Sequence, residues 1–449
     1  MPSALFDDGS AAIPAATPAP PERVIVVGAG IAGLTAANAL RTAGVECLVV
    51  EARDRIGGRL HTVEVDGVVA DLGGAWIHHP GANVLDAWVR FAGVPFIADP
   101  NGTAFTGADL GEGRVLTPEE LAGVGYAALD PVAAIVAADE AAGRPDRSAL
   151  EVVEQHLATL PDGADRDRLR QLMASMIEQD AAGPLGDVSA RWIFDAQSLV
   201  GDVVDNIAVD GYRSVLAPLA AGTRILLDRP VRRVVQTEEG VTVEGDGWSE
   251  SGSHVVVTAP LGVLKAGAIE FVPPLHPERQ AIVERAGFGS MEKVVVAFAE
   301  PFWQADGLNH AVIHPADRSQ AAAWTWDYGR RAINFLIATS ATGAAWADPR
   351  GWAVEQLECL WGSPLPAEPS GVVATDWLHD EYAHGSYSHV RPGFTDADND
   401  ALGEPLGRML FAGEHTTGAR GGYADGAMTS GLREAKRLLQ RPAVELSAP

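Results

Sequence analysis

The chain has 449 residues, which is enough for two or three domains with a sizeable core. Its 33 basic and 60 acidic side chains give a formal net charge of −27, which argues against binding to nucleic-acid phosphates or to an anionic membrane. A hydrophobic content of 47% with 21% charged residues indicates a globular protein. The 49 glycines make up about 11% of the 449 residues, which is more than the usual share of about 7%, so their positions are informative.

Residues 1–21 are rich in Ala and Pro and lack the basic and apolar regions of a secretory signal, so we expect a disordered leader there. The sequence contains no apolar stretch of the length that a membrane span needs. Cys47 and Cys359 are too few for a disulfide framework or a zinc site. We therefore expect no metal and predict a reducing, cytoplasmic setting.

A βαβ unit is predicted to begin at residue 23. The apolar, β-branched run 23–27 predicts a buried parallel strand, residues 34–43 predict an Ala-rich helix, and residues 47–50 predict a second strand. The motif G-x-G-x-x-G at 28–33 joins the first strand to the helix, and Glu51 closes the second strand. Glycines in this context, with an acid at this spacing, predict a dinucleotide site.

Each residue of this motif has an expected role. Gly28 permits the tight turn, Gly30 lets the backbone approach a diphosphate, and Gly33 lets the helix and strand pack closely. The amides at the helix N-terminus then receive the diphosphate, with help from the helix dipole. Glu51 is expected to accept hydrogen bonds from the adenosine ribose.

The rest of the chain predicts a second domain threaded through the nucleotide-binding fold. Residues 117–197 are rich in Ala, Leu, Glu and Arg, which predicts several helices. Strands are predicted after them, and a final helix is predicted over 426–439. The predicted strands cover residues 224–227, 231–235, 241–243, 254–258, 293–298, 311–313, 332–337 and 409–413.

Two further small-residue stretches suggest which dinucleotide is bound. The run 52–59 carries a glycine pair flanked by arginines, which predicts another backbone contact with a diphosphate and a clamp from Arg59. The run 71–76 offers a place where backbone can approach a flat ring. These two runs and the C-terminal run 411–416 resemble the FAD-binding signatures of flavin-containing amine oxidases. That family includes monoamine oxidases, polyamine oxidases and lysine-specific histone demethylases.

The resemblance spans residues 23–439 and is closest to the polyamine oxidase branch. It implies an α/β fold in which a Rossmann-like, doubly wound FAD-binding domain is interleaved with an α+β substrate-binding domain. We expect the FAD-binding domain to comprise residues 22–80, 221–272 and 375–441, and the substrate-binding domain to comprise 81–220 and 273–374. The expected FAD contacts are Gly28, Gly30, Ile31, Ala32, Gly33, Glu51, Ala52, Arg53, Gly58, Arg59, Gly74, Ala75, Trp76, Val231, Trp377, Gly413, Glu414 and Ala424.

The resemblance also assigns the reacting groups. Lys293 matches the lysine that holds a water against the flavin N5 atom, and Tyr387 and Tyr423 match the two aromatic walls of the substrate cage. Ser386 stands where monoamine oxidases attach FAD through a cysteine, so the FAD is expected to be non-covalent. The helix near Gly426 is expected to direct its N-terminus at the flavin N1/O2 edge.

The implied reaction is hydride transfer from the carbon beside a neutral primary or secondary amine to flavin N5. The resulting imine hydrolyses to an aldehyde, and O2 reoxidises the flavin to give hydrogen peroxide. An alkyl amine is mostly charged at pH 7, because its pKa is about 10, so turnover is expected to rise with pH toward about 9. His78 and Glu178 are substrate-binding candidates, as is Asp180, although for the two acids solvated surface positions are the favoured interpretation.

Other interpretations stay open at this point. An L-amino acid oxidase would need an arginine to hold a carboxylate, and Arg213, Arg330 and Arg331 have no assigned role. A flavin-bound interaction protein is the non-enzymatic alternative. The sequence shows no chromatin-binding appendage, which argues against a histone demethylase. The expected partners are a small-molecule amine and O2, while the oligomeric state is open, a homodimer included.

Overall fold

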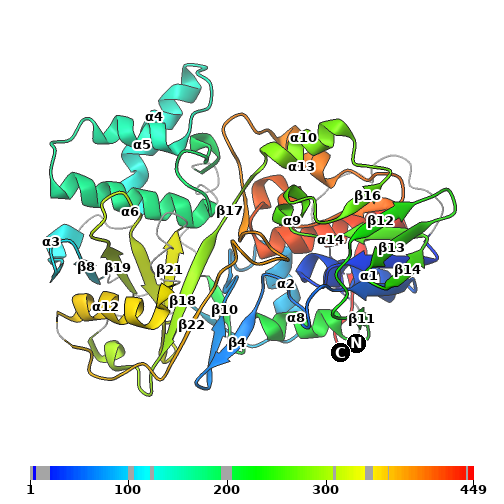
Figure 1. The fold of residues 1–449 in the computed structure, drawn as a ribbon, viewed down its shortest axis with the longest axis horizontal. Helices are drawn as coiled ribbons and strands as arrows, with labels where there is room; N and C mark the ends of the chain where they lie inside the picture. The colour runs from blue at the N-terminus through cyan, green and yellow to red at the C-terminus, as the bar shows by residue number, and fades with distance from the viewer. Residues whose placement is uncertain are drawn as a thin grey trace.

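The computed structural model describes residues 4–6, 21–99, 106–121, 126–193, 205–306, 310–338, 347–362, 364–440 and 443–449. The predicted leader lies outside this part of the chain except at its edges, where β1 (Ala4–Phe6) pairs antiparallel with β25 (Val444–Leu446). Residues 122–125 and 194–197 of the predicted helical region also lie outside it. The described residues form two lobes of mixed α and β structure (Figure 1).

A five-stranded parallel sheet forms the centre of one lobe. Its strands are ordered β11-β3-β2-β15-β24, and every neighbouring pair is parallel. Buried β-branched residues dominate these strands, as the sequence predicts for a sheet that is covered on both faces. The strands are β2 (Arg23–Val27), β3 (Glu46–Val50), β11 (Arg224–Leu226), β15 (His254–Val257) and β24 (Met409–Phe411).

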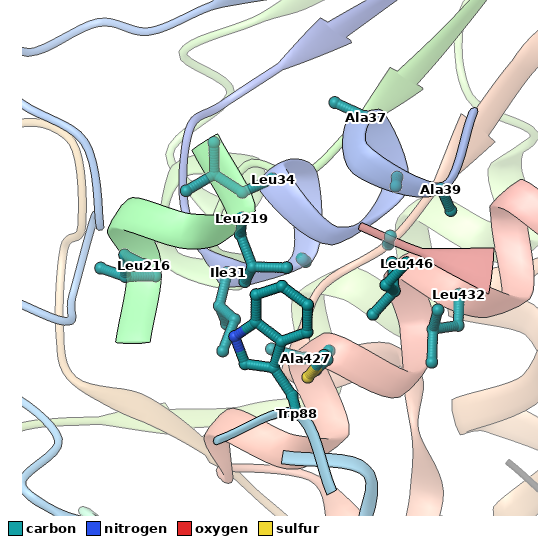
Figure 2. Close-up of a cluster of buried hydrophobic side chains, with 14 of the residues drawn as sticks. Ile31, Leu34, Ala37, Ala39, Trp88, Leu216, Leu219, Ala427, Leu432 and Leu446 are labelled. Atoms are coloured by element: carbon teal, nitrogen blue, oxygen red, sulfur yellow. The ribbon is translucent and has the colours of Figure 1, made fainter. Parts of the chain in front are cut away.

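Helices cover one face of this sheet. Val24 and Val26 of β2 face a core formed with α1 (Ile31–Thr42), α2 (Val84–Phe91), α8 (Tyr212–Ala220) and α14 (Ala424–Leu439). Figure 2 shows Trp88 of α2 at the centre of this cluster. Residues of the other three helices surround it, among them Ile31, Leu34, Leu216, Leu219, Ala427 and Leu432, and Leu446 of β25 also belongs to the cluster.

The opposite face of the parallel sheet differs from the doubly wound arrangement that we expected. Ile25 and Val27 pack against a four-stranded sheet rather than against helices. Successive residues of a strand point to opposite faces, so β2 contributes to both cores. The covering strands are β12 (Arg233–Gln236), β13 (Val241–Gly245), β14 (Trp248–Gly252) and β16 (Glu270–Val272).

The second lobe is built on a seven-stranded sheet with helices on both faces. Its strand order is β22-β18-β21-β20-β19-β8-β9, and it includes the three strands predicted near residues 293, 311 and 332. Helices α4 (Asp130–Ala141), α5 (Ala149–Leu157) and α6 (Ala164–Ala181) form the core on one face, and α12 (Pro349–Trp361) covers the other. The strands are β8 (Thr106–Asp109), β9 (Arg114–Val115), β18 (Met291–Ala297), β19 (His310–His314), β20 (Ala323–Trp326), β21 (Ala332–Ala338) and β22 (Gly371–Ala374).

Local sequence signals define several of these helices. Helix α5 begins at a capping box, in which the Ser148 hydroxyl accepts from the Glu151 backbone N–H and the Glu151 carboxylate accepts from the Ser148 backbone. Helix α12 ends at Gly362, which takes the left-handed conformation that terminates helices. None of the helices in the described part of the chain combines the length and apolar character that a membrane span requires.

Short elements connect the lobes. They include the hairpin of β4 (Thr62–Val65) and β5 (Val68–Asp71), and the pair of β17 (Gly287–Gly289) and β23 (Tyr387–His389), which lie between the two lobes in Figure 1. The three-stranded sheet β6-β10-β7 is another connection. The chain passes between the lobes more than once. The exact residue boundaries of the two domains remain a prediction. Further elements of the described chain are the strands β6 (Trp76–Ile77), β7 (Phe96–Ala98) and β10 (Asn206–Ala208) and the helices α9 (Leu261–Lys265), α10 (Pro277–Arg285) and α13 (Asp396–Gly403).

Candidate active site

A cavity of about 820 Å³ lies between the two lobes. Elements of both lobes line it: the turn between β2 and α1, the start of α14, helix α6 and strands β18 to β21. Apart from Gly33, every residue predicted to contact FAD lines this cavity: Gly28, Gly30, Ile31, Ala32, Glu51, Ala52, Arg53, Gly58, Arg59, Gly74, Ala75, Trp76, Val231, Trp377, Gly413, Glu414 and Ala424. The structure therefore brings them together, while the contact of each with FAD stays a prediction.

Gly33 is the exception because its role is packing. A Cβ atom at Gly33 would lie 2.1 Å from the backbone oxygen of Gly28, so only glycine lets α1 approach the turn this closely. A similar constraint holds at Gly73, where a Cβ would lie 1.6 Å from the Arg59 oxygen. Both glycines let backbone segments close around the cavity, which is the arrangement that a large flat ligand requires.

Glu51 is oriented by the backbone around it. Its carboxylate is buried and accepts hydrogen bonds from the Ala29 backbone N–H at 2.6 Å and from the Arg53 backbone N–H at 3.0 Å. Each oxygen retains a second lone pair for a ligand hydroxyl. The buried acceptor at the end of β3, beside the glycine turn at the start of α1, fits the ribose and diphosphate of a dinucleotide.

Arg59 and Glu414 form a half-buried network on another wall of the cavity. Arg59 Nη1 donates to the Ser386 carbonyl oxygen at 2.6 Å and to Glu414 Oε1 at 2.8 Å. Glu414 Oε2 accepts from the Ser388 hydroxyl at 2.5 Å and from the Gly422 backbone N–H at 2.8 Å. Burial tends to raise the pKa of Glu414, but the Arg59 charge and these hydrogen bonds outweigh it and hold the pKa below its usual range. Glu414 is therefore ionised and paired before any ligand binds.

Lys293 reaches the cavity from β18 and is completely buried. Its Nζ donates to the backbone oxygens of Asp71 at 3.0 Å and Gly73 at 2.7 Å. Burial lowers the pKa of Lys293 to about 8, and the nearby Asp71 and Arg330 charges act in opposite directions on it. With two of its three hydrogen-bonding positions taken, Nζ keeps one for the cavity.

The two cage tyrosines also line the cavity. The Tyr387 hydroxyl donates to the Gln179 carbonyl oxygen of α6, and Tyr423 is the N-cap residue of α14. A Cβ at Gly422 would lie 3.5 Å from the Tyr387 ring, so the residue preceding Tyr423 packs directly on Tyr387. Tyr423 has the Arg420 guanidinium 4.5 Å from its ring centroid, and Arg420 is itself paired with Asp425.

His78 lies beside Tyr423, with ring centroids 5.4 Å apart in an edge-on arrangement. Its Nδ1 is 2.7 Å from Asp205 Oδ2, and the other oxygen of Asp205 accepts from the His79 backbone N–H at 3.1 Å. Burial tends to raise the pKa of Asp205, yet the histidines beside it lower that pKa overall. His78 and Asp205 thus form a polar pair on the cavity wall.

Glu178 is the sequence-predicted candidate that the structure does not place in the cavity. Its side chain is buried, and its carboxylate accepts from the Leu185 backbone N–H at 3.3 Å. Substrate binding by Glu178 therefore gains no support from this geometry and stays a prediction, whereas the alternative of an exposed surface position was wrong. Asp180, two residues later on α6, lines the cavity instead, because alternate residues near the end of that helix point in different directions.

This geometry agrees with what comparison with known proteins finds. The family model for flavin containing amine oxidoreductases matches residues 31–439. The chain belongs to this family. It is 31% identical to lysine-specific histone demethylase 1 homolog 1 of Oryza sativa subsp. japonica over 94% of the chain and 52% of that protein. It is 31% identical to the homolog 2 protein of Arabidopsis thaliana over 93% of the chain and 58% of that protein, and 27% identical to polyamine oxidase 4 of Oryza sativa subsp. japonica over 96% of the chain and 91% of that protein.

Two conclusions follow from family membership. FAD is the cofactor of this family, and the glycine turn, the buried Glu51 acceptor and the cavity volume fit it. The chain spans little more than half the length of the demethylase relatives that it matches. The sequence resembles both branches of the family, and its identity to the demethylase relatives (31%) is higher than its identity to polyamine oxidase 4 (27%).

Several lining residues escaped prediction from the sequence. Asp205 and Gln179 had no motif to mark them, and an aromatic wall is formed by His310, Trp324 and Trp326 on β19 and β20. Trp324 and Trp326 are stacked with ring centroids 5.6 Å apart. These tryptophans alternate within a short apolar run, which was a signal for a strand face but not for a cavity.

Glu292 is a further residue that the sequence could have indicated. It is buried in the apolar strand β18, next to Lys293, and it accepts from the Trp377 backbone N–H at 3.0 Å and the Thr375 hydroxyl at 2.5 Å. Burial raises the pKa of Glu292 despite these hydrogen bonds. A buried acid in an apolar strand needs partners, so its presence indicated a structural anchor near the site.

Proposed function

We propose that this protein is an FAD-dependent amine oxidase that converts a primary or secondary amine, preferably a polyamine, to an imine and then an aldehyde, with O2 reduced to hydrogen peroxide. The observation that carries the proposal is that Lys293, Tyr387 and Tyr423 line the same cavity as the glycine turn and Glu51. A site that oxidises an amine needs the cofactor cradle and the amine-binding groups in one water-excluding space. FAD, when bound, supplies the acceptor for the hydride.

The chain's own residues supply binding, orientation and proton placement. Tyr387 and Tyr423 offer ring faces to the amine, and the Gln179 hydrogen bond fixes the Tyr387 ring. Lys293 holds a water or a proton at the one position of Nζ that its two backbone acceptors leave open. His78 and Asp205 bind polar groups of the substrate. We further propose that residues 22–80, 221–272 and 375–441 form the FAD-binding domain and that the other lobe holds the substrate.

The arginines argue for an amine rather than an amino acid. Arg330 donates to the Val69 and Ala208 carbonyl oxygens, Arg331 donates to those of Phe298 and Asp66, and Arg213 pairs with a glutamate. None of these three lines the cavity. None of these three arginines is therefore placed to hold a substrate carboxylate in the bidentate way that an L-amino acid oxidase needs.

Demethylation of a lysine side chain is the second candidate, since the demethylase relatives are 31% identical to this chain. Polyamine oxidase 4, in contrast, is matched over 91% of its length. Both candidate reactions oxidise a carbon next to nitrogen. They differ in the substrate, a free polyamine or a lysine side chain, that the substrate half of the cavity has to admit. Asp180 and Asp205 line that half and favour a substrate with more than one positive charge.

FAD is proposed to be bound without a covalent link. The Ser386 hydroxyl lies on the cavity wall, donates to the Met291 carbonyl oxygen at 2.8 Å and accepts from the Met291 backbone N–H at 3.0 Å. Neither cysteine of the chain lines the cavity. A serine held in this way offers no thiolate for attachment.

A peroxide-coupled assay tests the proposal. The holoenzyme is mixed separately with spermine, spermidine, putrescine, an aromatic monoamine, an L-amino acid mixture and a dimethyl-lysine peptide. We expect peroxide from the polyamines, with a rate that rises between pH 7 and 9. Peroxide and formaldehyde from the peptide alone would favour the demethylase candidate, and peroxide from the amino acids alone would refute the proposal. If an amine bleaches the flavin under argon but no peroxide forms in air, then O2 is not the electron acceptor.

A further inference from the structure

A loop of residues 377–386 crosses between the two lobes and is fixed at both ends. At its start the Trp377 backbone N–H donates to Glu292 Oε2 at 3.0 Å. At its end the Ser386 N–H donates to the Gly289 carbonyl oxygen at 2.7 Å, and the Gly385 N–H donates back to the Trp377 oxygen at 2.8 Å. Gly385 has φ of +134°, and a Cβ there would lie 2.6 Å from the Gly289 oxygen. The ends of this loop are therefore anchored independently of its middle.

The middle of the loop is held by an ion pair. Arg53 Nη1 and Nη2 donate to the two carboxylate oxygens of Asp380 at 2.9 and 2.6 Å. The Tyr382 ring lies 5.4 Å from the Arg53 guanidinium carbon, and its backbone N–H donates to Asp380 Oδ1 at 2.8 Å. Both ionic side chains are mostly buried, with exposures of 14% for Arg53 and 23% for Asp380. A planar bidentate pair of this kind is among the stronger polar contacts in proteins.

This ion pair lies at the Glu51 end of the cavity. The Arg53 backbone N–H donates to Glu51 Oε1, and the Arg53 carbonyl oxygen accepts from the Asp228 N–H at 2.9 Å. Arg53 lines the cavity together with Tyr382 of the loop. Val231, another of the expected FAD contacts, lines it too. The loop therefore walls the adenosine end of the FAD site.

We propose that Arg53 and Asp380 form a clasp that retains FAD, in which the pair holds the 377–386 loop across the adenosine end of the cavity. Asp380 acts through Arg53 and is a positioning residue for the cofactor. FAD leaves when the pair opens and the middle of the loop lifts between its two fixed ends. The neighbouring pair of Arg232 and Glu381, at 3.6 Å and with exposures of 44% and 62%, is too exposed to replace the clasp. The proposal rests on FAD binding and does not depend on which amine is oxidised.

The test is the rate of FAD release from the holoenzyme of Asp380→Asn, followed by the rise in flavin fluorescence after dilution. The asparagine keeps the shape of the side chain and removes its charge, so we expect release to be about tenfold faster, which is ~1.4 kcal/mol. Arg53→Lys keeps the charge but loses the bidentate geometry, and it should also release FAD faster than the wild type. Asp187→Asn is the control for losing an ion pair outside the cavity, because its partner Arg391 is at 2.8 Å, the two side chains are 43% and 41% exposed, and neither residue lines the cavity.

The outcomes separate a clasp from a merely structural contact. Asp380→Asn removes the counter-charge of the mostly buried Arg53, so we expect the melting temperature of the apoprotein to fall in this variant. The proposal expects, in addition, that FAD release is about tenfold faster at a temperature well below that melting temperature, where both proteins are folded. Unchanged release in both Asp380→Asn and Arg53→Lys would overturn it. Equal acceleration in Asp187→Asn would also overturn it. No amine is present in this experiment, so a failed turnover assay would leave its result intact.

Discussion

The buried amine of Lys293 gives the most quantitative prediction. Its pKa is lowered by burial from 10.5 to about 8. Between these two pH values the unfolded chain still holds a proton that the folded protein has lost, so stability rises with pH in this window. Below about pH 8 both states are protonated, and the folded state carries the full cost of a buried ammonium. A difference of about 2.5 pH units corresponds to ~3 kcal/mol of stability gained between pH 8 and 10.5.

The chain is suited to a direct measurement because its only lysines are Lys265, Lys293 and Lys436. Protein labelled with ¹³C at lysine Cε gives few NMR signals, and the signal that disappears in Lys293→Met belongs to Lys293. We expect that signal to titrate near pH 8. In parallel, urea unfolding of the apoprotein between pH 7.5 and 10 should show the wild type gaining stability relative to Lys293→Met, since all other groups titrate in both proteins.

Two results would refute this reasoning. A Lys293 signal that titrates near its ordinary 10.5 would mean that Nζ is solvated. A stability difference between wild type and Lys293→Met that is independent of pH would mean the same. Either result would remove the physical basis for a lysine that changes its protonation state within the working pH range of the site.

Three further predictions concern the same cavity. Acid precipitation should release the yellow flavin into the supernatant, because Ser386 offers no thioether; flavin in the pellet would contradict this. Glu414→Gln should weaken FAD binding at least tenfold and lower the free energy of unfolding by about 1–3 kcal/mol, because Arg59 loses its counter-charge. Titration of the apoprotein with FAD, followed by fluorescence, measures the Kd, and an unaltered Kd would contradict this prediction. Tyr423→Ala should raise KM for the amine about tenfold with FAD content unchanged, while Tyr423→Phe keeps the ring and most of the affinity; equal KM values in both variants would show that the ring does not bind the amine.

The nucleotide-binding half was largely predictable because its signals are local. The β-branched run of β2, the three glycines and Glu51 occur within one βαβ unit, and each has a steric or hydrogen-bonding reason that needs no distant partner. The lysine of β18 was predicted through the family resemblance alone, and its burial in an apolar strand is a finding of the structure.

The partners of these residues were not predictable, because they come from far along the chain. Arg53 pairs with Asp380, and His78 pairs with Asp205, across more than a hundred residues in each case. No local pattern encodes such pairings. Strand β8 (Thr106–Asp109) escaped prediction for a related reason, since its parallel pairing with the distant strand β19 holds this short segment in the sheet.

These long-range pairings change how the site is expected to hold its anionic cofactor. Arg53 and Arg59 were both predicted as FAD ligands, and Arg59 was predicted as the clamp on the diphosphate, yet each already has an acidic partner within the protein. Pairing avoids an uncompensated buried charge when the cavity holds no anion. The diphosphate is then left mainly to the backbone amides of the glycine turn and the N-terminus of α1, which carry no net charge. The chain has a net charge of −27. Binding of the anionic FAD is therefore expected to depend more on backbone geometry than on attraction between net charges.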